Sequence, residues 1–228
     1  PRSTLFPYTT LFRSALERAQ EILYALKRLE TSGAIQPIPV YVDSPLVVNI
    51  TEVFRLHTEC FDADFARVMR EEGDPFQLRF VKYIRDRSQS MQLNALDGPA
   101  IIMAASGMCE FGRIVHHLRN TIEDVRNTIL IVGFQAENTL GRRIVEKNRT
   151  VRILGVPREL NAQVRIMNEF SAHAGKSELE NFAGRLPEET KILLVHGEDV
   201  AMNELKKNML ASGRRDERIM KHGAPVEI

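Results

Sequence analysis

The chain has 228 residues, an apolar content of 43% and a formal net charge of +1, which allows one large or two small domains with a sizeable core. The near-neutral charge says nothing by itself about nucleic acids, so any phosphate-binding surface has to be a local patch. Two distant cysteines argue against a disulfide framework or a thiolate zinc site and fit a cytoplasmic protein, and the lack of an 18-residue apolar run excludes a membrane-spanning helix.

The first fourteen residues differ in character from the rest of the chain. Segment 1–14 is rich in aromatic residues and Thr, and it lacks the layout of a signal peptide. Residues 5–14 are similar to the translation of a common sequencing-adaptor oligonucleotide. We therefore expect 1–14 to be a non-native leader that does not pack on the rest of the chain. The alternative is a genuine N-terminal strand.

Strand-type and helical patterns alternate through most of the remaining sequence. In chain order we predict a helix from residue 15 to before Gly33, a strand over 38–42, a helix from Pro45 to about His57, a strand over 99–104, a helix over 112–121, a strand over 128–132 and a helix over 140–147. Segment 62–97 is polar and mixed. Such alternation is typical of an α/β fold with a mostly parallel sheet and helices on its faces.

The character of the sequence changes near Gly155, where we place a domain boundary. It separates residues 15–155 from residues 156–228. In the second part we predict a half-exposed strand over 163–167, a helix capped by Ser177, an apolar strand over 191–195 and a last helix over 200–210.

Two histidines of the second part stand in short and unusual contexts. His173 lies in the sequence FSAHA, and His196 lies in LVHGE, 23 positions later. His196 should end a strand, at the edge where layered α/β proteins bind ligands and metals. Either histidine alone is more often a surface residue. Together, with Gly197 permitting close approach, they indicate a ligand or an acid/base group.

Polar and basic residues gather where the predicted strand 99–104 passes into a helix. Backbone N–H groups at Ser106 and Gly107 suit a phosphate, and a plain turn fits equally well. Arg113, in the first turn of the helix, could add a bidentate contact to phosphate. Arg142 begins the next helix, where the dipole disfavours a cation, so another reason for its presence is plausible, and we predict that it binds a phosphate.

Four further motifs accompany the two histidine frames. They are YVDSPL at 41–46, SGMCEFGRI at 106–114, HHL at 116–118 and TLGR at 139–142. Together, over about residues 15–228, they resemble the β-CASP branch of the metallo-β-lactamase superfamily, a group of zinc nucleases that process RNA. The resemblance implies a parallel-sheet β-CASP cap domain, 15–155, followed by the C-terminal part of a metallo-β-lactamase αββα domain, 156–228.

The resemblance also implies roles for individual residues. His196 corresponds to the last metal ligand, and His173 to the acid or phosphate-binding histidine. Ser171 could contact the same phosphate as His173. In the family, an H-x-H-x-D-H run supplies most of the ligands of two zinc ions. This run is not found in this chain. The chain therefore resembles the back half of such an enzyme.

The expected function is that of a fragment of a zinc-dependent ribonuclease that hydrolyses RNA phosphodiester bonds, the fragment itself being inactive. The alternative is a non-catalytic RNA-binding or scaffold member of the same family. A nucleotide-binding Rossmann-like enzyme is less favoured, because no G-x-G-x-x-G follows a predicted strand. The expected partners are RNA and, in a homodimer, a second copy of the chain, with no membrane contact.

Overall fold

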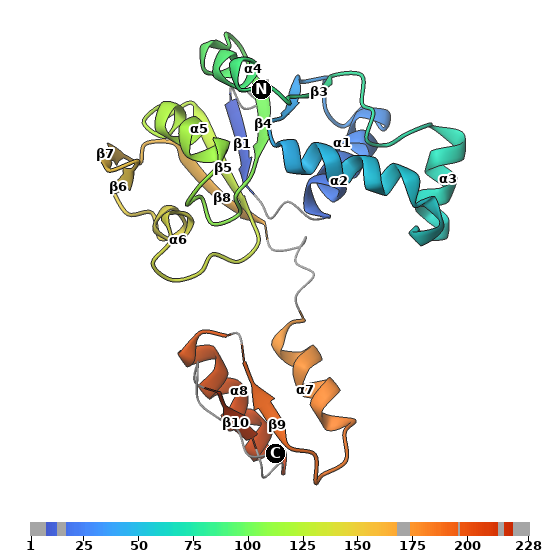
Figure 1. The fold of residues 1–228 in the computed structure, drawn as a ribbon, viewed down its shortest axis with the longest axis vertical. Helices are drawn as coiled ribbons and strands as arrows, with labels where there is room; N and C mark the ends of the chain where they lie inside the picture. Colours follow the sequence, from blue (N-terminus) through green and yellow to red (C-terminus); the bar gives the residue numbers. More distant parts are fainter. Residues whose placement is uncertain (1–7, 13–16, 168–173, 196, 214–216, 221–228) are drawn as a thin grey trace. The chain divides into compact units, whose positions relative to one another are not determined.

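The computed structural model describes residues 8–12, 17–167, 174–195, 197–213 and 217–220. These residues fall into two compact units, one within 1–170 and one within 171–228 (Figure 1). None of the described helices combines the length and the apolar character needed to span a membrane.

The first unit is a parallel α/β sheet with helices on both faces. Its elements are β1 (Tyr8–Phe12), α1 (Arg18–Thr31), β2 (Val40–Val42), α2 (Pro45–Leu56), the 3-10 helix η1 (Thr58–Cys60), α3 (Ala63–Glu71), β3 (Val81–Tyr83), α4 (Arg87–Gln92), the 3-10 helix η2 (Leu93–Ala95), β4 (Ala100–Ala104), α5 (Arg113–Thr121), β5 (Asn127–Val132), α6 (Leu140–Val145), β6 (Thr150–Ile153), β7 (Val156–Glu159) and β8 (Gln163–Met167). The sheet has the order β3-β2-β4-β1-β5-β8, and every pairing in it is parallel. The predicted fold class is confirmed.

Local sequence explains where several helices begin. Ser44 accepts a hydrogen bond from the Val47 amide at 3.4 Å, and Pro45 occupies the first turn, as predicted for α2. Within the unassigned segment 62–97, Asp62 caps α3 by accepting from the Phe65 amide at 2.7 Å. Both caps satisfy amides that the helix itself leaves unpaired.

The expectation that segment 1–14 does not pack on the rest of the chain was wrong for its strand. The backbone of Tyr8–Phe12 pairs with both β4 and β5, with Tyr8 in register with Ala100 and Asn127. Thr and aromatic residues favour strands, and a strand in this slot gives both neighbouring ladders their hydrogen-bond partners. The non-native origin of the segment stays a prediction.

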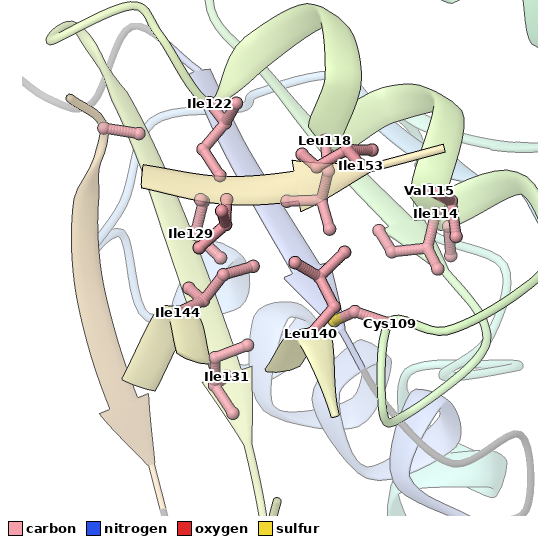
Figure 2. Packing of buried hydrophobic residues seen from close by; sticks show 13 residues of the cluster. Cys109, Ile114, Val115, Leu118, Ile122, Ile129, Ile131, Leu140, Ile144 and Ile153 are labelled. Atoms are coloured by element: carbon pink, nitrogen blue, oxygen red, sulfur yellow. The ribbon is translucent and has the colours of Figure 1, made fainter. Parts of the chain in front are cut away.

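Alternate residues of the central strands supply two cores, one on each face of the sheet. Ile129 and Ile131 of β5 pack with α5, α6 and the β6–β7 hairpin, as Figure 2 shows. Leu130 and Val132 join the opposite core, formed with α1 and α2. Side chains alternate between the faces of a strand, so a strand buried on both faces is apolar throughout.

The second unit contains two helices and two short strands. They are α7 (Lys176–Gly184), β9 (Ile192–Leu194), α8 (Asp199–Ala211) and β10 (Glu217–Ile219), with β9 and β10 parallel. Ala183, Leu194 and Met209 form its small core. The prediction that Ser177 caps α7 was wrong. The helix begins after Gly175, whose amide donates to the Glu178 carboxylate at 2.7 Å.

The boundary predicted near Gly155 does not coincide with the division between the two units. Gly155 lies in the turn between β6 and β7, which pair as an antiparallel hairpin. The first unit extends to residue 170 because β8 pairs in register with β5.

Candidate functional site

The motifs of the first unit meet at the carboxyl edge of its parallel sheet. Asp43 follows β2, Arg85 lies just beyond β3, Ser106 follows β4, and Gln135 lies beyond β5. Parallel strands end at a common edge, which is where open α/β sheets bind ligands. We therefore treat this edge as the candidate site.

The loop over 105–112 folds back on itself before α5 begins. The Ser106 amide donates to the Phe111 carbonyl at 3.2 Å, and the Ile114 amide donates to the Ala105 carbonyl at 3.4 Å. Among the described residues, the buried Ser106 hydroxyl has no hydrogen-bond partner, and no side chain caps α5. A buried hydroxyl without a partner is destabilising, so a ligand or water is expected to satisfy it.

Gly112 is required by the geometry of this loop. Its φ is 83° and its ψ is −171°, a region that is essentially restricted to glycine. A Cβ atom at this position would lie 2.6 Å from the Ala105 carbonyl oxygen. Gly155 has a similar φ of +79°, but a Cβ atom there would meet nothing within 4 Å. Substitution of Gly112 would therefore introduce both backbone strain and a steric clash, whereas substitution of Gly155 would introduce strain alone.

We expect Gly112→Ala to lower the free energy of unfolding by about 3 kcal/mol, because strain and the clash with Ala105 add together. The matched variant Gly155→Ala carries the strain alone, at about 1–2 kcal/mol. Urea unfolding of both variants, compared at equal m-values, measures the difference. Equal losses would show that the close approach to Ala105 is easily relieved.

The first residues of α6 are hydrogen-bonded to the loop after β4. The Gly141 amide donates to the Met108 carbonyl at 3.0 Å, and the Leu140 amide donates to the Glu110 carboxylate. A Cβ at Gly141 would lie 1.8 Å from the Gln135 side-chain oxygen, which is buried and lacks a partner among the described residues. These contacts therefore fix the start of α6 and the loop after β4 to each other at the sheet edge.

The side-chain contacts of Arg142 explain why an arginine is found at the start of α6. Its Nε atom donates to Glu146 at 2.7 Å, one turn along α6, and its guanidinium also lies 3.5 Å from the Gln135 carbonyl oxygen. The helix itself is capped by Thr139, which accepts from the Arg142 amide at 3.2 Å. Phosphate binding by Arg142 stays a prediction.

Asp43 is the centre of a buried polar network. Its side chain is 0% exposed, and one carboxylate oxygen accepts from the Arg113 guanidinium at 2.6 Å. The other oxygen accepts from the Ser90 hydroxyl at 2.6 Å and lies 2.6 Å from Nε2 of His117. Asp43 does not cap α2, because Ser44 alone does so and the Asp43 side chain is buried in the network.

The protonation of this network follows from its contacts. Nδ1 of His117 is buried and has no partner among the described residues, so a proton placed there would be a buried, unpaired donor. We therefore assign the proton on Nε2 of His117 to the hydrogen bond with Asp43. Burial alone would raise the pKa of Asp43, but hydrogen bonds from His117, Ser90 and Arg113 outweigh it and hold that pKa below its ordinary value.

Arg113 is held by more than the carboxylate. It also donates to the Ile84 carbonyl at 3.1 Å and to the Arg85 carbonyl at 2.6 Å. The adjacent His116 and His117 point to different sides of α5, since His116 is exposed and His117 is buried.

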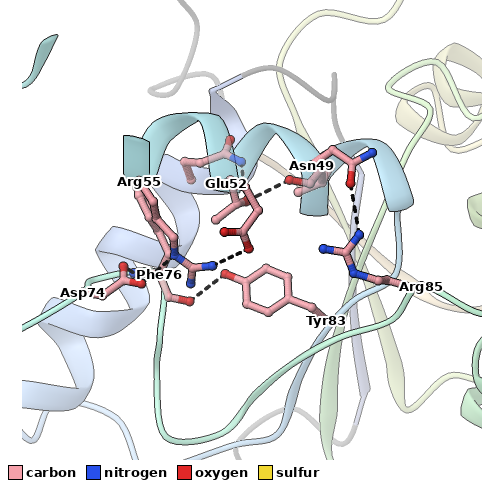
Figure 3. Close-up of polar contacts among 10 residues, drawn as sticks. Asn49, Glu52, Arg55, Asp74, Phe76, Tyr83 and Arg85 are labelled. Carbon is pink, nitrogen blue, oxygen red and sulfur yellow. Dashed lines mark hydrogen bonds and ion pairs between the residues drawn. The ribbon is translucent and has the colours of Figure 1, made fainter. Parts of the chain in front are cut away.

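A second polar network fastens the segment before β3 to α2 (Figure 3). Arg55 donates to Asp74 and to Glu52, each at 2.7 Å, and its guanidinium lies 5.7 Å from the centre of the Tyr83 ring. The Tyr83 hydroxyl donates to the Phe76 carbonyl at 2.6 Å, and burial raises the pKa of Tyr83 to about 12. Burial keeps Tyr83 protonated, and the network links α2 and β3 to the segment that precedes β3.

Arg85 joins the Asp43 network to α2. Its side chain donates to Asn49 of α2 at 3.1 Å, while its carbonyl oxygen accepts from Arg113 of α5. Sequence reasoning missed the roles of Asp43, Ser90 and Arg85. The sequence does contain a signal for Asp43. It is a carboxylate at the end of a strand, and Arg113 and His117 lie four residues apart on one helix face, where both can reach it.

The remaining predicted site residues lie outside the described residues. They are Ser171, His173 and His196. Their predicted convergence beside Ser106 and Arg113 therefore stays a prediction. Within the described ranges, no group of three or more His, Cys, Asp or Glu side chains could hold a metal ion. The described residues by themselves do not fit a zinc site.

Comparison with known proteins identifies two matched segments. Residues 19–144 match the Beta-Casp domain, and residues 158–219 match a Zn-dependent metallo-hydrolase RNA specificity domain. The predicted boundary near Gly155 lies between the two matched segments.

Several curated proteins are similar along most of the chain. Ribonuclease TTHA0252 of Thermus thermophilus is 35% identical over 201 residues, which cover 88% of this chain and 45% of that protein. Transcription termination factor FttA of Methanosarcina mazei is 27% identical over 202 residues, covering 84% of this chain and 31% of that protein. FttA of Lokiarchaeum sp. is 30% identical over 197 residues, which cover 81% of this chain and 30% of that protein.

The chain thus spans between 30% and 45% of the length of these relatives. The Beta-Casp match nevertheless covers more than half of the chain, and it extends over the sheet edge described above. The second matched segment is also of the zinc-hydrolase type. This chain belongs to the β-CASP branch of the metallo-β-lactamase superfamily.

Proposed function

We propose that the full-length protein hydrolyses RNA phosphodiester bonds and depends on zinc, and that this chain supplies a phosphate-contacting edge to the reaction. The observation that carries the proposal is the buried Ser106 hydroxyl without a partner among the described residues, in the loop that precedes α5 at the carboxyl edge of the sheet. The Ser106 amide is already bonded to the Phe111 carbonyl, but the hydroxyl can donate to a phosphate oxygen, at the edge where open α/β sheets bind ligands. The match to an RNA specificity domain supports RNA as the ligand.

In this proposal Ser106 and Gly107 contact the phosphate directly. Ser171 is a further candidate contact from the second part of the chain. Arg142 adds positive charge at the same edge, partly balanced by Glu146. Arg113 is the first residue of α5, and its guanidinium contacts the Asp43 carboxylate.

The two histidines outside the described residues have separate proposed roles. His173 holds a phosphate oxygen or donates a proton to the leaving oxygen, a task that suits the pKa of imidazole. His196 is one zinc ligand, and the other ligands of the two expected ions come from beyond the described residues. When bound, zinc supplies an activated hydroxide and stabilises charge on phosphate oxygens. We place the protein in a reducing cytoplasm, which fits two free cysteines.

The alternative function is that of a non-catalytic RNA-binding or scaffold protein. It is favoured by the relatives whose printed names describe transcription termination factors rather than nucleases. The two proposals differ in whether RNA is cleaved, so one assay separates them.

The test compares the full-length protein with this 228-residue chain in cleavage of a labelled RNA, with and without a chelator. We expect metal-dependent cleavage by the full-length protein. The chain alone should bind little zinc and cleave nothing, because the described residues lack a metal-binding cluster. RNA binding without cleavage by zinc-loaded full-length protein would favour the scaffold. Chelator-resistant cleavage would overturn the zinc-dependent mechanism.

A further inference from the structure

The buried carboxylate of Asp43 joins segments that are far apart in the sequence. Ser90 reaches it from α4, and Arg113 and His117 reach it from α5. Through Arg113, the carbonyl groups that follow β3 join the same network. Asp43 itself is fixed by its amide, which donates to the Met103 carbonyl of β4 at 2.7 Å.

Two of these contacts fix the first turn of α5. Arg113 and His117 are four residues apart, so they lie on one face of the helix and bind the two oxygens of a single carboxylate. Attachment at two points resists both rotation and sliding of the helix. Because the Ile114 amide donates to Ala105, the position of α5 also sets the position of loop 105–112.

The donors of Arg113 are largely committed to the protein. Three of its five N–H groups point at Asp43, Ile84 and Arg85, and the charge of Asp43 balances its own. A guanidinium held in this way is a poor phosphate ligand, because binding an anion would compete with a buried ion pair.

We propose that Asp43, Arg113 and His117 form a positioning network that holds loop 105–112 so that Ser106 and Gly107 meet a phosphate. Arg113 is then a positioning residue rather than a phosphate ligand. The inference rests on the proposed function in one respect, that the ligand of the loop is a phosphate. The geometric part concerns the loop alone and can be tested without any ligand.

Amide hydrogen exchange of this chain tests the geometric part. In Arg113→Lys and in Asp43→Asn, the amides of Cys109 and Ile114 should exchange at least about tenfold faster, while the β5 amides keep their relative protection. Ser90→Ala removes a contact to Asp43 without touching α5 and is the matched control, with loop exchange close to wild type. A uniform rise at all amides would show ordinary destabilisation and overturn the proposal.

Titration with inorganic phosphate, followed at the Ser106 and Gly107 amides, tests the role of Arg113. If Arg113 positions the loop, Asp43→Asn should weaken phosphate binding by roughly tenfold, since small misplacements of a binding group have large effects. If Arg113 were itself a ligand, losing the Asp43 charge would release it and tighten binding. Tighter or unchanged binding overturns the proposal.

A wild-type chain whose Ser106 and Gly107 amides do not respond to phosphate would count against the proposed function instead. The exchange measurement would still decide the positioning network, because it involves no ligand. The two failures are therefore distinguishable.

Discussion

Replacing Asp43 with alanine is expected to lower the free energy of unfolding of the first unit by about 3–5 kcal/mol, the usual range when one partner of a buried ion pair is removed. The variant leaves the Arg113 charge, the Ser90 hydroxyl and the His117 N–H without their acceptor in a fully buried position. Urea unfolding measures the loss. The matched control is Glu59→Ala, which removes an exposed carboxylate paired with His57 and should leave the midpoint unchanged.

The same carboxylate predicts how stability depends on pH. The pKa of Asp43 is lower in the folded chain than the value of about 3.9 for an unfolded aspartate. Its ionised form therefore stabilises the fold above about pH 4, and this contribution is lost as the pH falls further through the folded-state pKa. The stability difference between wild type and Asp43→Asn should shrink on acidification below pH 4. A difference that stays constant from about pH 3 to pH 7 would contradict the assignment.

The second large effect is expected for His173 in the full-length protein. His173→Ala should lower the rate of RNA cleavage by about a hundredfold or more if this residue acts as general acid, while most of the bound zinc is retained. His196→Ala should instead lower the zinc content, because His196 is the proposed ligand. Metal analysis beside cleavage of a labelled RNA separates the two roles.

The matched control for both variants is His116→Ala. His116 is exposed on α5, and neither metal content nor rate should change on its replacement. Full cleavage activity in His173→Ala, or unchanged zinc in His196→Ala, would refute the assigned roles.

Local patterns predicted the elements whose signals lie within a few residues. Ser44 and Pro45 located the start of α2, and the apolar runs located β4 and β5, because caps and burial act over short ranges. The start of α7 was misplaced because Ser177 is a good cap by type, whereas Glu178 returns to the Gly175 amide.

The candidate site was harder to predict because it depends on distant pairs. Asp43, Ser90 and His117 come from three separate segments, and only the packed sheet brings them within hydrogen-bond distance. The expectation for segment 1–14 failed because it rested on the supposed origin of the segment. The origin of a segment does not determine whether its Thr and aromatic residues can pair as a strand, as β1 does. The histidine frames pointed to residues outside the described ranges.

The strand order has a consequence for synthesis of the chain. Strand β1 is synthesised before its two neighbours in the sheet, β4 and β5, which end only at Ala104 and Val132. Until β4 emerges, β1 has neither neighbour, and until β5 emerges one edge of β1 stays unpaired. Unpaired strand edges of this kind invite association with other chains, and non-local pairings form slowly. Between the synthesis of Phe12 and that of Val132 the nascent chain therefore carries an incompletely paired strand, and chaperone binding in this interval would most affect its yield.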